Sequence, residues 1–231
     1  MRILKGKDII TDKWEQLYKS SSFATFFQSP DCYRFYKELS FMSPFVYAVE
    51  EEGMIKALVC GYLIAEKGFA KSYFSRRAII PGGVLLADNV TDEEIGLLLS
   101  TVATDLRRKA IYIELRNLHD YSAYKGAFQK ADFEYQAHLN YQISIHSGDE
   151  VFANFSDNRK RQIKQSITEG LVCEETSRIE DIQAFFRVLQ KTYNKKLKLP
   201  LFPFEFFETI VSKANGHLLV VKNKGKILGV S

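Results

Sequence analysis

The sequence predicts an α/β protein whose mixed sheet is flanked by helices on both faces. Three observations lead to this prediction. Helical and strand-like periodicities alternate along the 231 residues. The clearest helix, at residues 91–109, is followed directly by an alternating strand at 111–117. The residues around position 50 recur around position 222. A hydrophobic content of 46% and an aromatic content of 13% support a substantial core.

The composition narrows the functional classes. The chain is long enough for one large domain or two small ones. Its three cysteines are odd in number and widely spaced, which is typical of reduced thiols in a cytoplasm. Its four histidines show no metal-ligand spacing, and the N-terminus lacks the apolar run of a signal peptide. No uncharged apolar run is long enough to span a bilayer. We therefore expect a soluble, cytoplasmic protein without a metal site or a permanently bound cofactor.

The first expected elements are two helices and a hairpin. One helix begins at Thr11 or Asp12, and a second begins at Pro30, because proline suits a first helical turn. An apolar strand at 45–49, a turn and a return strand at 55–65 then form a hairpin.

A further strand, a glycine turn and the clearest helix come next. Residues 71–77 form a strand that runs into a loop at 80–84. Thr91 caps the helix at 91–109, and Glu94 lies three residues on, which is the capping-box arrangement.

The segment after this helix alternates strictly between apolar and polar residues, as a half-buried strand does. Its inward residues are Ile111, Ile113 and Leu115, and its outward residues are Tyr112, Glu114 and Arg116. A helix at 122–130 and a long strand at 133–145 complete the first set of elements.

Four positive charges gather in one short segment without an acid among them: Arg159, Lys160, Arg161 and Lys164. The chain has 32 Lys+Arg against 28 Asp+Glu, so its formal net charge of +4 equals the charge of this segment. The local periodicity predicts a short helix that is capped by Asp157 or Asn158 and ended by Gly170.

This basic helix is read in two ways. Ile163 and Ile167 stand four residues apart and form a narrow apolar stripe, which Arg159 extends toward the N-terminus. Arg159 is therefore expected to point into a cleft, with Lys160 and Lys164 in a second row. The alternative is a solvated basic face without a ligand.

The plan of the chain restarts after the basic helix. A strand at 171–175, a helix at 179–193, a helix opened by Pro203 and a hairpin at 217–231 follow in order. Val49–Ile55 aligns with Val221–Ile227 at an offset of 172, and Pro30 aligns with Pro203 at an offset of 173. This agreement favours duplication of a domain over two unrelated hairpins.

The repeat predicts three segments. Residues 1–150 are expected to form a first domain, 151–170 a basic inter-domain helix, and 171–231 the first part of a second, truncated copy. A complete second copy would need roughly another hundred residues. The last hairpin would then have an unpaired edge, which we expect to be available for dimerisation.

Four features resemble the FemAB-type transferases and their relatives in the GNAT-like N-acetyltransferase superfamily. They are Phe27-Gln28-Ser29-Pro30 before a helix, Tyr73-Phe74-Ser75-Arg76-Arg77 running into Pro81-Gly82-Gly83-Val84, the strand Ile113-Glu114-Leu115-Arg116, and the basic helix at 158–170. The family has two such domains in tandem, which agrees with the internal repeat.

The resemblance implies amide formation, with an acyl or aminoacyl group transferred onto an amine. The donor is expected to be acyl-CoA or aminoacyl-tRNA. The acceptor is expected to be a phosphorylated sugar or a peptidoglycan precursor of the cell wall or of a surface polysaccharide. The glycine loop that binds CoA in ordinary acetyltransferases is absent, because Pro81-Gly82-Gly83 lies near its place but no helix start follows. The donor site is therefore expected in the missing part of the second domain. Residues 1–231 alone are accordingly expected to be inactive.

The resemblance also implies which residues bind the acceptor. The inter-domain basic motif matches Arg159, Lys160 and Arg161 together with Lys164, and the loop after the Tyr/Arg strand matches Arg76, Arg77, Gly82 and Gly83. Arginine suits phosphate because its planar donors bind two oxygens at once.

The residues themselves add two candidates and one constraint. Glu114 and Arg116 share one strand face and could line a pocket, or else form an exposed ion pair. Arg76 and Arg77 point to opposite faces if their strand persists, so only one of them can enter a site, and Tyr73 shares the face of Arg77.

The catalytic residues are not identified by the sequence. No serine or cysteine has a neighbouring base in a recognised pattern, so covalent nucleophilic catalysis has no support. A second functional class is a non-catalytic nucleic-acid-binding or scaffolding module whose basic helix contacts phosphates. Confinement of the charge to one segment argues against it.

Overall fold

A computed structural model describes residues 1–65, 75–139, 148–197, 200–213 and 216–230. The chain divides into two units, Met1–His138 (unit 1) and Leu139–Ser231 (unit 2). Each unit has its own sheet. The assignment of residues to a first domain, a connecting helix and a partial second copy stays a prediction.

Unit 1 is built on a mixed sheet. Its strands are β1 (Arg2–Lys5), β2 (Met42–Glu51), β3 (Met54–Ile64), β4 (Arg77–Ile80), β5 (Val84–Leu86) and β6 (Tyr112–Leu115). Their order is β1-β2-β3-β4-β6, and β5 pairs with β3 beside β4. All pairs are antiparallel except β4 and β6, which run parallel. The predicted mixed sheet is therefore confirmed.

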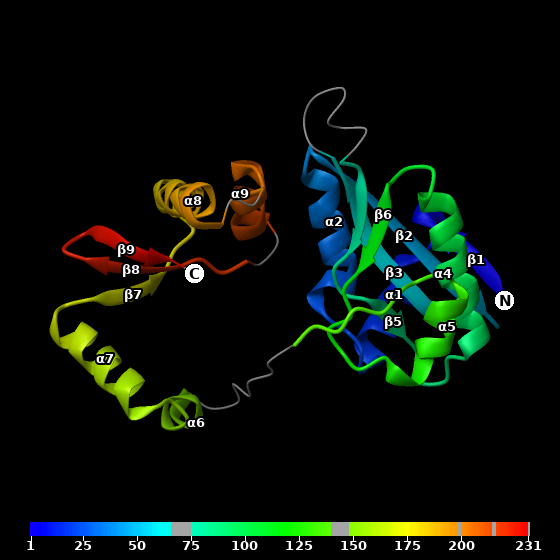
Figure 1. The fold of residues 1–231 in the computed structure, drawn as a ribbon, viewed down its shortest axis with the longest axis horizontal. Coiled ribbons are helices and arrows are strands. Elements are labelled where there is room, and N and C mark those ends of the chain that lie inside the picture. Colours follow the sequence, from blue (N-terminus) through cyan, green and yellow to red (C-terminus); the bar gives the residue numbers. More distant parts are fainter. Residues whose placement is uncertain (66–74, 140–147, 198–199, 214–215, 231) are drawn as a thin grey trace. The chain divides into compact units, whose positions relative to one another are not determined.

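Helices cover both faces of this sheet (Figure 1). They are η1 (Gly6–Asp8), α1 (Thr11–Ser20), η2 (Phe26–Gln28), α2 (Pro30–Glu38), α4 (Asp92–Leu106), η3 (Ser122–Tyr124) and α5 (Lys125–Lys130). On one face, the ring of Tyr36 in α2 lies 4.9 Å from the ring of Tyr62 in β3. On the other face, α4 and α5 bury their apolar side chains against β2–β6.

Helix α4 forms where the sequence predicts it because both its cap and its stripe are strong. The Thr91 backbone N–H donates to Glu94 at 2.7 Å, and the Glu94 N–H donates back to the Thr91 hydroxyl at 3.3 Å. The apolar stripe is buried: Ile95, Leu98, Leu99, Val102 and Leu106. Each of these side chains contributes about 2 kcal/mol through burial, so the stripe fixes α4 on the sheet.

Some boundaries differ from the predictions. A strand was expected at 71–77, but the observed strand β4 runs from Arg77 to Ile80. Residues 71–74 lie outside the described residues. Ile111 precedes β6 and is 59% exposed instead of inward. The expected strand at 133–145 is wrong for residues 133–139, which have no regular structure and are almost all exposed, so they pair with no sheet. Residues 140–145 lie outside the described residues.

Unit 2 contains a second, antiparallel sheet of order β7-β8-β9. Its elements are α6 (Gly148–Ala153), α7 (Asp157–Thr168), β7 (Val172–Glu175), α8 (Ile179–Thr192), the π-helix η4 (Tyr193–Leu197), α9 (Phe204–Lys213), β8 (Leu219–Asn223) and β9 (Lys226–Val230). Its small core is centred on Ile182, Leu218 and Val220. The predicted strand, helix, helix and hairpin are all present, and α6 was not predicted.

The two hairpins of the chain share their irregularities as well as their sequence pattern. Each has a register shift at one point, between Val49 and Glu50 in β2 and between Val221 and Lys222 in β8. Each turn then has two residues with positive φ, at 50° and 78° in unit 1 and at 48° and 76° in unit 2. A shared bulge and turn are stronger evidence of equivalence than a shared strand, because both are local departures from regular pairing.

Candidate functional site

Four polar side chains come together on one face of the parallel pair β4 and β6. Arg77 pairs with Tyr112, and Ile79 pairs with Glu114. Because paired residues and residues two apart share a face, Arg77, Tyr112, Glu114 and Arg116 all lie on the same side of the sheet. We call this surface the β4–β6 face. It unites residues of two segments that the sequence analysis identified separately.

The ion pair on this face is a surface interaction. Arg116 Nε donates to Glu114 Oε1 at 2.6 Å, with the two side chains 56% and 39% exposed. The bond to Glu114 raises the pKa of Arg116 above its ordinary value, against the smaller effect of burial. At this exposure the pair contributes little to stability. Its charged groups are accessible to a ligand.

Sequence analysis missed Tyr62, which belongs to the same face. Tyr62 of β3 pairs with Ile79, whose other neighbour is Glu114. Burial raises the pKa of the Tyr62 phenol, while the nearby Arg116 and Arg77 act in the opposite direction. The buried phenol thus lies within electrostatic reach of both arginines. Its position in a long apolar strand gave no signal in the sequence.

The predicted alternation of Arg76 and Arg77 is not tested, because the strand begins only at Arg77. Arg77 is half-buried in β4 and lies on the β4–β6 face. Arg76 precedes the strand, and its carbonyl accepts a hydrogen bond from the Ile111 N–H at 2.8 Å. Tyr73, expected on the face of Arg77, lies outside the described residues.

Gly82 and Gly83 form a buried turn between β4 and β5. A side chain at position 82 would lie within 3.0 Å of Gln28, Thr25 and Phe27. Gly83 has a φ of +75°, and a Cβ there would come within 2.6 Å of Asn117 Oδ1. Glycine is therefore required at both positions by packing, and at position 83 also by backbone conformation. A role in substrate binding stays a prediction.

The Phe27-Gln28-Ser29-Pro30 motif builds the fold beside this turn. Gln28 is fully buried, and its Nε2 donates to the Gly82 carbonyl at 2.8 Å. The Trp14 indole N–H donates to the Gln28 carbonyl at 2.8 Å. The Ser29 hydroxyl accepts from the Cys32 N–H at 3.0 Å and so caps α2. This motif positions the β4–β5 turn, and its glutamine has no contact with solvent.

Helix α7 carries the predicted basic segment with one change at its start. Its cap is Ser156, whose hydroxyl accepts from the Arg159 N–H at 3.4 Å, and not Asp157 or Asn158. Its end is as predicted, because Gly170 has a φ of +80° and donates to the Ile167 carbonyl at 3.0 Å. The polar run and the glycine at its end therefore placed the helix, whereas its N-terminal cap lies one residue before the predicted one.

The cations of α7 make only local bonds among the described residues. Arg159 donates to Gln162 at 3.3 Å, Arg161 to Asn158 at 3.2 Å, and Lys160 to the Ala153 carbonyl at 2.8 Å. Arg159, Arg161 and Lys164 are exposed, and Ile167 on the apolar stripe is 67% exposed. The guanidinium groups thus remain accessible to solvent anions. Their assignment to an acceptor site stays a prediction.

Other features of the described residues bear on the kind of site. No helix there is long and apolar enough to cross a membrane. In the same part of the chain, no three His, Cys, Asp or Glu residues are grouped so that they could hold a metal ion. Two shallow hollows of unit 1, one on α1 and one around Phe133, include none of the predicted site residues.

Comparison with solved structures identifies the fold. A crystal structure of FemX superposes with a TM-score of 0.63 over 96% of this chain, at 14% sequence identity. The chain has the fold of FemX. It spans 57% of the length of the FemX chain. This match confirms the resemblance in fold to FemAB-type and GNAT-like proteins that the sequence predicted.

The other comparisons provide no further information on the family or function of this chain. A crystal structure of a probable acetyltransferase reaches a TM-score of 0.40 at 15% identity, covering 64% of this chain and 99% of that chain. That score is too low to support an argument. No family model matches the sequence. No curated protein matches it either.

Proposed function

We propose that this protein is an amide-forming N-acyl or aminoacyl transferase. The FemX-like fold over 96% of the chain is the observation that carries the proposal. The donor would be acyl-CoA or aminoacyl-tRNA, and the acceptor a phosphorylated sugar or peptidoglycan precursor of the cell wall or a surface polysaccharide.

Amide formation requires the protein mainly to bind the two substrates and to position them. An uncharged amine attacks the carbonyl carbon of a thioester or ester, and the C–S or C–O bond breaks. A base takes a proton from the amine nitrogen, and the leaving group departs as the CoA thiol or the tRNA hydroxyl after gaining a proton. Donors aimed at the developing oxyanion lower the barrier. Holding the acceptor amine in line with the donor carbonyl is the larger task, which suits a protein with cationic binding surfaces.

The β4–β6 face supports acceptor binding in unit 1. Arg77 lies in β4 and Arg116 directly after the parallel strand β6, and the buried phenol of Tyr62 lies within electrostatic reach of both. Arginine and phenol groups are suited to phosphate and sugar oxygens. We assign Glu114 the role of orienting Arg116 through their 2.6 Å bond.

Helix α7 offers a separate anion-binding surface within unit 2. Among the residues that the structure describes, its exposed guanidinium groups bond only to neutral side chains of the same helix, at 3.2 and 3.3 Å. Such weak local bonds are readily exchanged for a phosphate, because charge-assisted bonds are roughly twice as strong as neutral ones.

Calorimetry tests this assignment. A nucleotide-sugar precursor is titrated into the protein and into the double variant Arg159→Ala, Arg161→Ala. Loss of charge-assisted bonds is expected to weaken affinity by about tenfold or more without unfolding the exposed helix. The matched control is Arg187→Ala, an exposed arginine of α8 in the same unit. Unchanged affinity in the double variant would show that α7 does not bind the acceptor.

A further inference from the structure

In each unit, the first α-helix after the first strand of the sheet, α1 after β1 and α8 after β7, is tied to the second strand by an ion pair. In unit 1, Lys13 Nζ lies 2.7 Å from Glu50 Oε1. In unit 2, Lys222 Nζ lies 3.1 Å from Asp181 Oδ2. The helix contributes the cation in unit 1 and the anion in unit 2.

The helical partners occupy the same position in the two units. Lys13 is the third residue of α1, and Asp181 is the third residue of α8. Each is followed by a residue that anchors the helix in its core, Trp14 with 4% exposure and Ile182 with 2%. The N-terminal turn of each helix therefore approaches its sheet in the same way.

The strand partners are equivalent as well. Glu50 and Lys222 are each the first residue after the register shift in β2 and β8. Each lies three residues before the turn glycine with positive φ, Gly53 or Gly225. Because the sheets β1-β2-β3 and β7-β8-β9 have the same order and the same antiparallel pairing, the two ion pairs correspond with their signs reversed.

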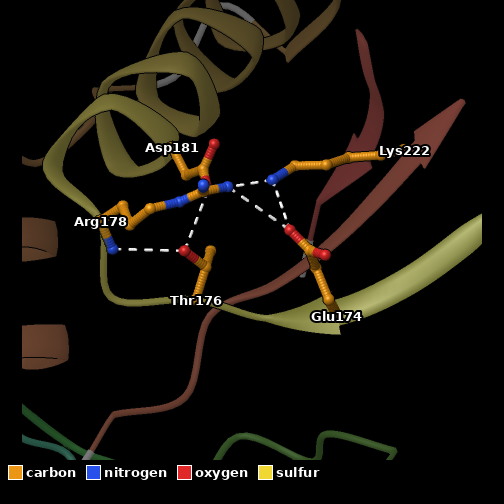
Figure 2. A network of polar contacts seen from close by, with 5 residues as sticks. All are labelled: Glu174, Thr176, Arg178, Asp181 and Lys222. Atoms are coloured by element: carbon orange, nitrogen blue, oxygen red, sulfur yellow. Dashed lines mark hydrogen bonds and ion pairs between the residues drawn. The ribbon is translucent and has the colours of Figure 1, made fainter. Parts of the chain in front are cut away.

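In each unit, further charged groups next to the ion pair stabilise it, and their signs are also reversed between the units. Arg2 donates to the other oxygen of Glu50 at 2.5 Å. In unit 2, Glu174 lies 2.5 Å from Lys222, while Arg178 and Thr176 donate to Asp181 at 2.8 and 2.9 Å (Figure 2). Reversal of polarity thus extends to the groups around the pair.

Exchanging the helices between the sheets would bring like charges together. Helix α1 on the sheet of unit 2 would place Lys13 against Lys222, whose side chain is only 13% exposed. Helix α8 on the sheet of unit 1 would place Asp181 against Glu50, whose side chain is 8% exposed. Like charges in contact, taken partly out of water, are strongly unfavourable. The apolar faces alone would discriminate weakly, since both helices bury a large side chain at the next position.

We propose that this reversed ion pair is a pairing device that keeps each helix on its own sheet while the chain folds. Two units with the same element order in one chain are prone to misassembly, because each helix meets two similar apolar sheets. Opposite polarity raises the free energy of a helix bound to the sheet of the other unit and lowers that of a helix on its own sheet. The inference is independent of the proposed transferase activity.

Refolding tests the device. The variant Arg2→Glu, Lys13→Glu, Glu50→Lys reverses unit 1 so that both units have the same polarity. Each native pair is retained, but the crossed pairs become attractive. After dilution from urea, the fraction that elutes as native monomer is expected to fall about twofold or more, with misassembled or exchanged species in its place. Amide protection of β2 and β8 identifies the native monomer.

Two further variants separate mispairing from simple destabilisation. Arg2→Lys, Lys13→Arg, Glu50→Asp changes the same positions without changing sign, and its monomer yield should match that of the unmodified protein. Adding Glu174→Lys, Arg178→Glu, Asp181→Lys and Lys222→Glu to the reversed variant restores opposite polarity and should restore the yield. A reversed variant that refolds normally, or a yield that stays low in the seven-fold variant, would overturn the proposal.

Discussion

The Gln28 side-chain amide donates a 2.8 Å hydrogen bond to the carbonyl of Gly82, and so ties the start of α2 to the turn that joins β4 and β5. The Gln28 oxygen accepts from the Thr25 N–H at 2.9 Å, which leaves the amide satisfied inside the core. A glutamine in this position fixes a turn that carries no side chain of its own. The carboxyl end of β4 beside β6 is thereby held in place.

Replacing this glutamine should destabilise unit 1. Gln28→Leu keeps the side-chain volume but leaves the Gly82 carbonyl and the Thr25 N–H without their partner, at a cost of about 2–4 kcal/mol. The measurement is the urea midpoint, with Gln16→Leu on the exposed face of α1 as the matched control. Equal midpoints for the two variants would show that the buried amide contributes nothing.

Two glycines should respond to alanine in opposite directions. Gly83→Ala places a Cβ 2.6 Å from Asn117 Oδ1 at a φ of +75°, and should cost about 1–3 kcal/mol. Gly96 lies within α4, with open space around the added methyl group. Gly96→Ala should therefore raise stability by about 0.5–1 kcal/mol, the helix propensity difference. The melting temperatures of both variants measure these changes. A shift of the same sign in both variants would contradict the claim that the β4–β5 turn requires glycine at position 83.

The stability of unit 1 should depend on pH through Glu50. Hydrogen bonds from Lys13 and Arg2 hold the pKa of Glu50 below its ordinary value of 4.5. A depressed pKa in the folded state contributes stability that is present above the unfolded value and is lost as pH falls through the folded value. The urea midpoint of Glu50→Gln should thus lie below that of the unmodified protein at pH 7.

The difference between these two proteins should shrink at acidic pH, as Glu50 becomes protonated in the unmodified protein. Glu52→Gln, in the exposed turn next to this strand, is the matched control and should change the midpoint little at either pH. A difference that persists unchanged as the pH falls through and below the lowered pKa of Glu50 would show that the charge of Glu50 is not its source.

Binding to RNA would follow a different pattern from binding to a small acceptor. A nucleic-acid-binding α7 that contacts several phosphates would lose affinity steeply with salt, because each contact releases counterions. We expect weak RNA binding with a small salt slope, since the excess charge is confined to one helix of 12 residues. Fluorescence anisotropy at several salt concentrations measures the slope. A steep slope that Arg159→Ala, Arg161→Ala flattens would favour the nucleic-acid-binding function.

Sequence patterns predicted most of the fold where local signals were strong. The capping box of Thr91 and Glu94 gave α4, and the glycine at 170 gave the end of α7. The alternation at 133–139 predicted a strand wrongly. A strand forms only where a neighbouring strand can pair with it, and the sequence of one segment does not show whether such a neighbour exists. β5 escaped notice because three apolar residues after a turn carry no periodicity.

The candidate site was only partly predictable for a similar reason. Arg77, Glu114 and Arg116 were identified from charge and alternation, but their union on one face depends on parallel pairing of β4 with β6. The reversed ion pair could not be found by aligning the two halves of the sequence, because its two partners have different offsets. Glu50 and Lys222 are 172 residues apart, whereas Lys13 and Asp181 are 168 apart, so no single offset aligns both partners. Only the register and helix positions reveal the correspondence.

Acceptor binding at the β4–β6 face is the most direct test of the proposed function. Calorimetric titration of a nucleotide-sugar precursor should give binding that Arg77→Ala and Arg116→Ala each weaken by about 10–100-fold, the loss of one or two charge-assisted bonds. Arg108→Ala, in the exposed turn after α4, should bind as the unmodified protein does. No heat of binding to the unmodified protein, or equal affinity in all three variants, would contradict the account.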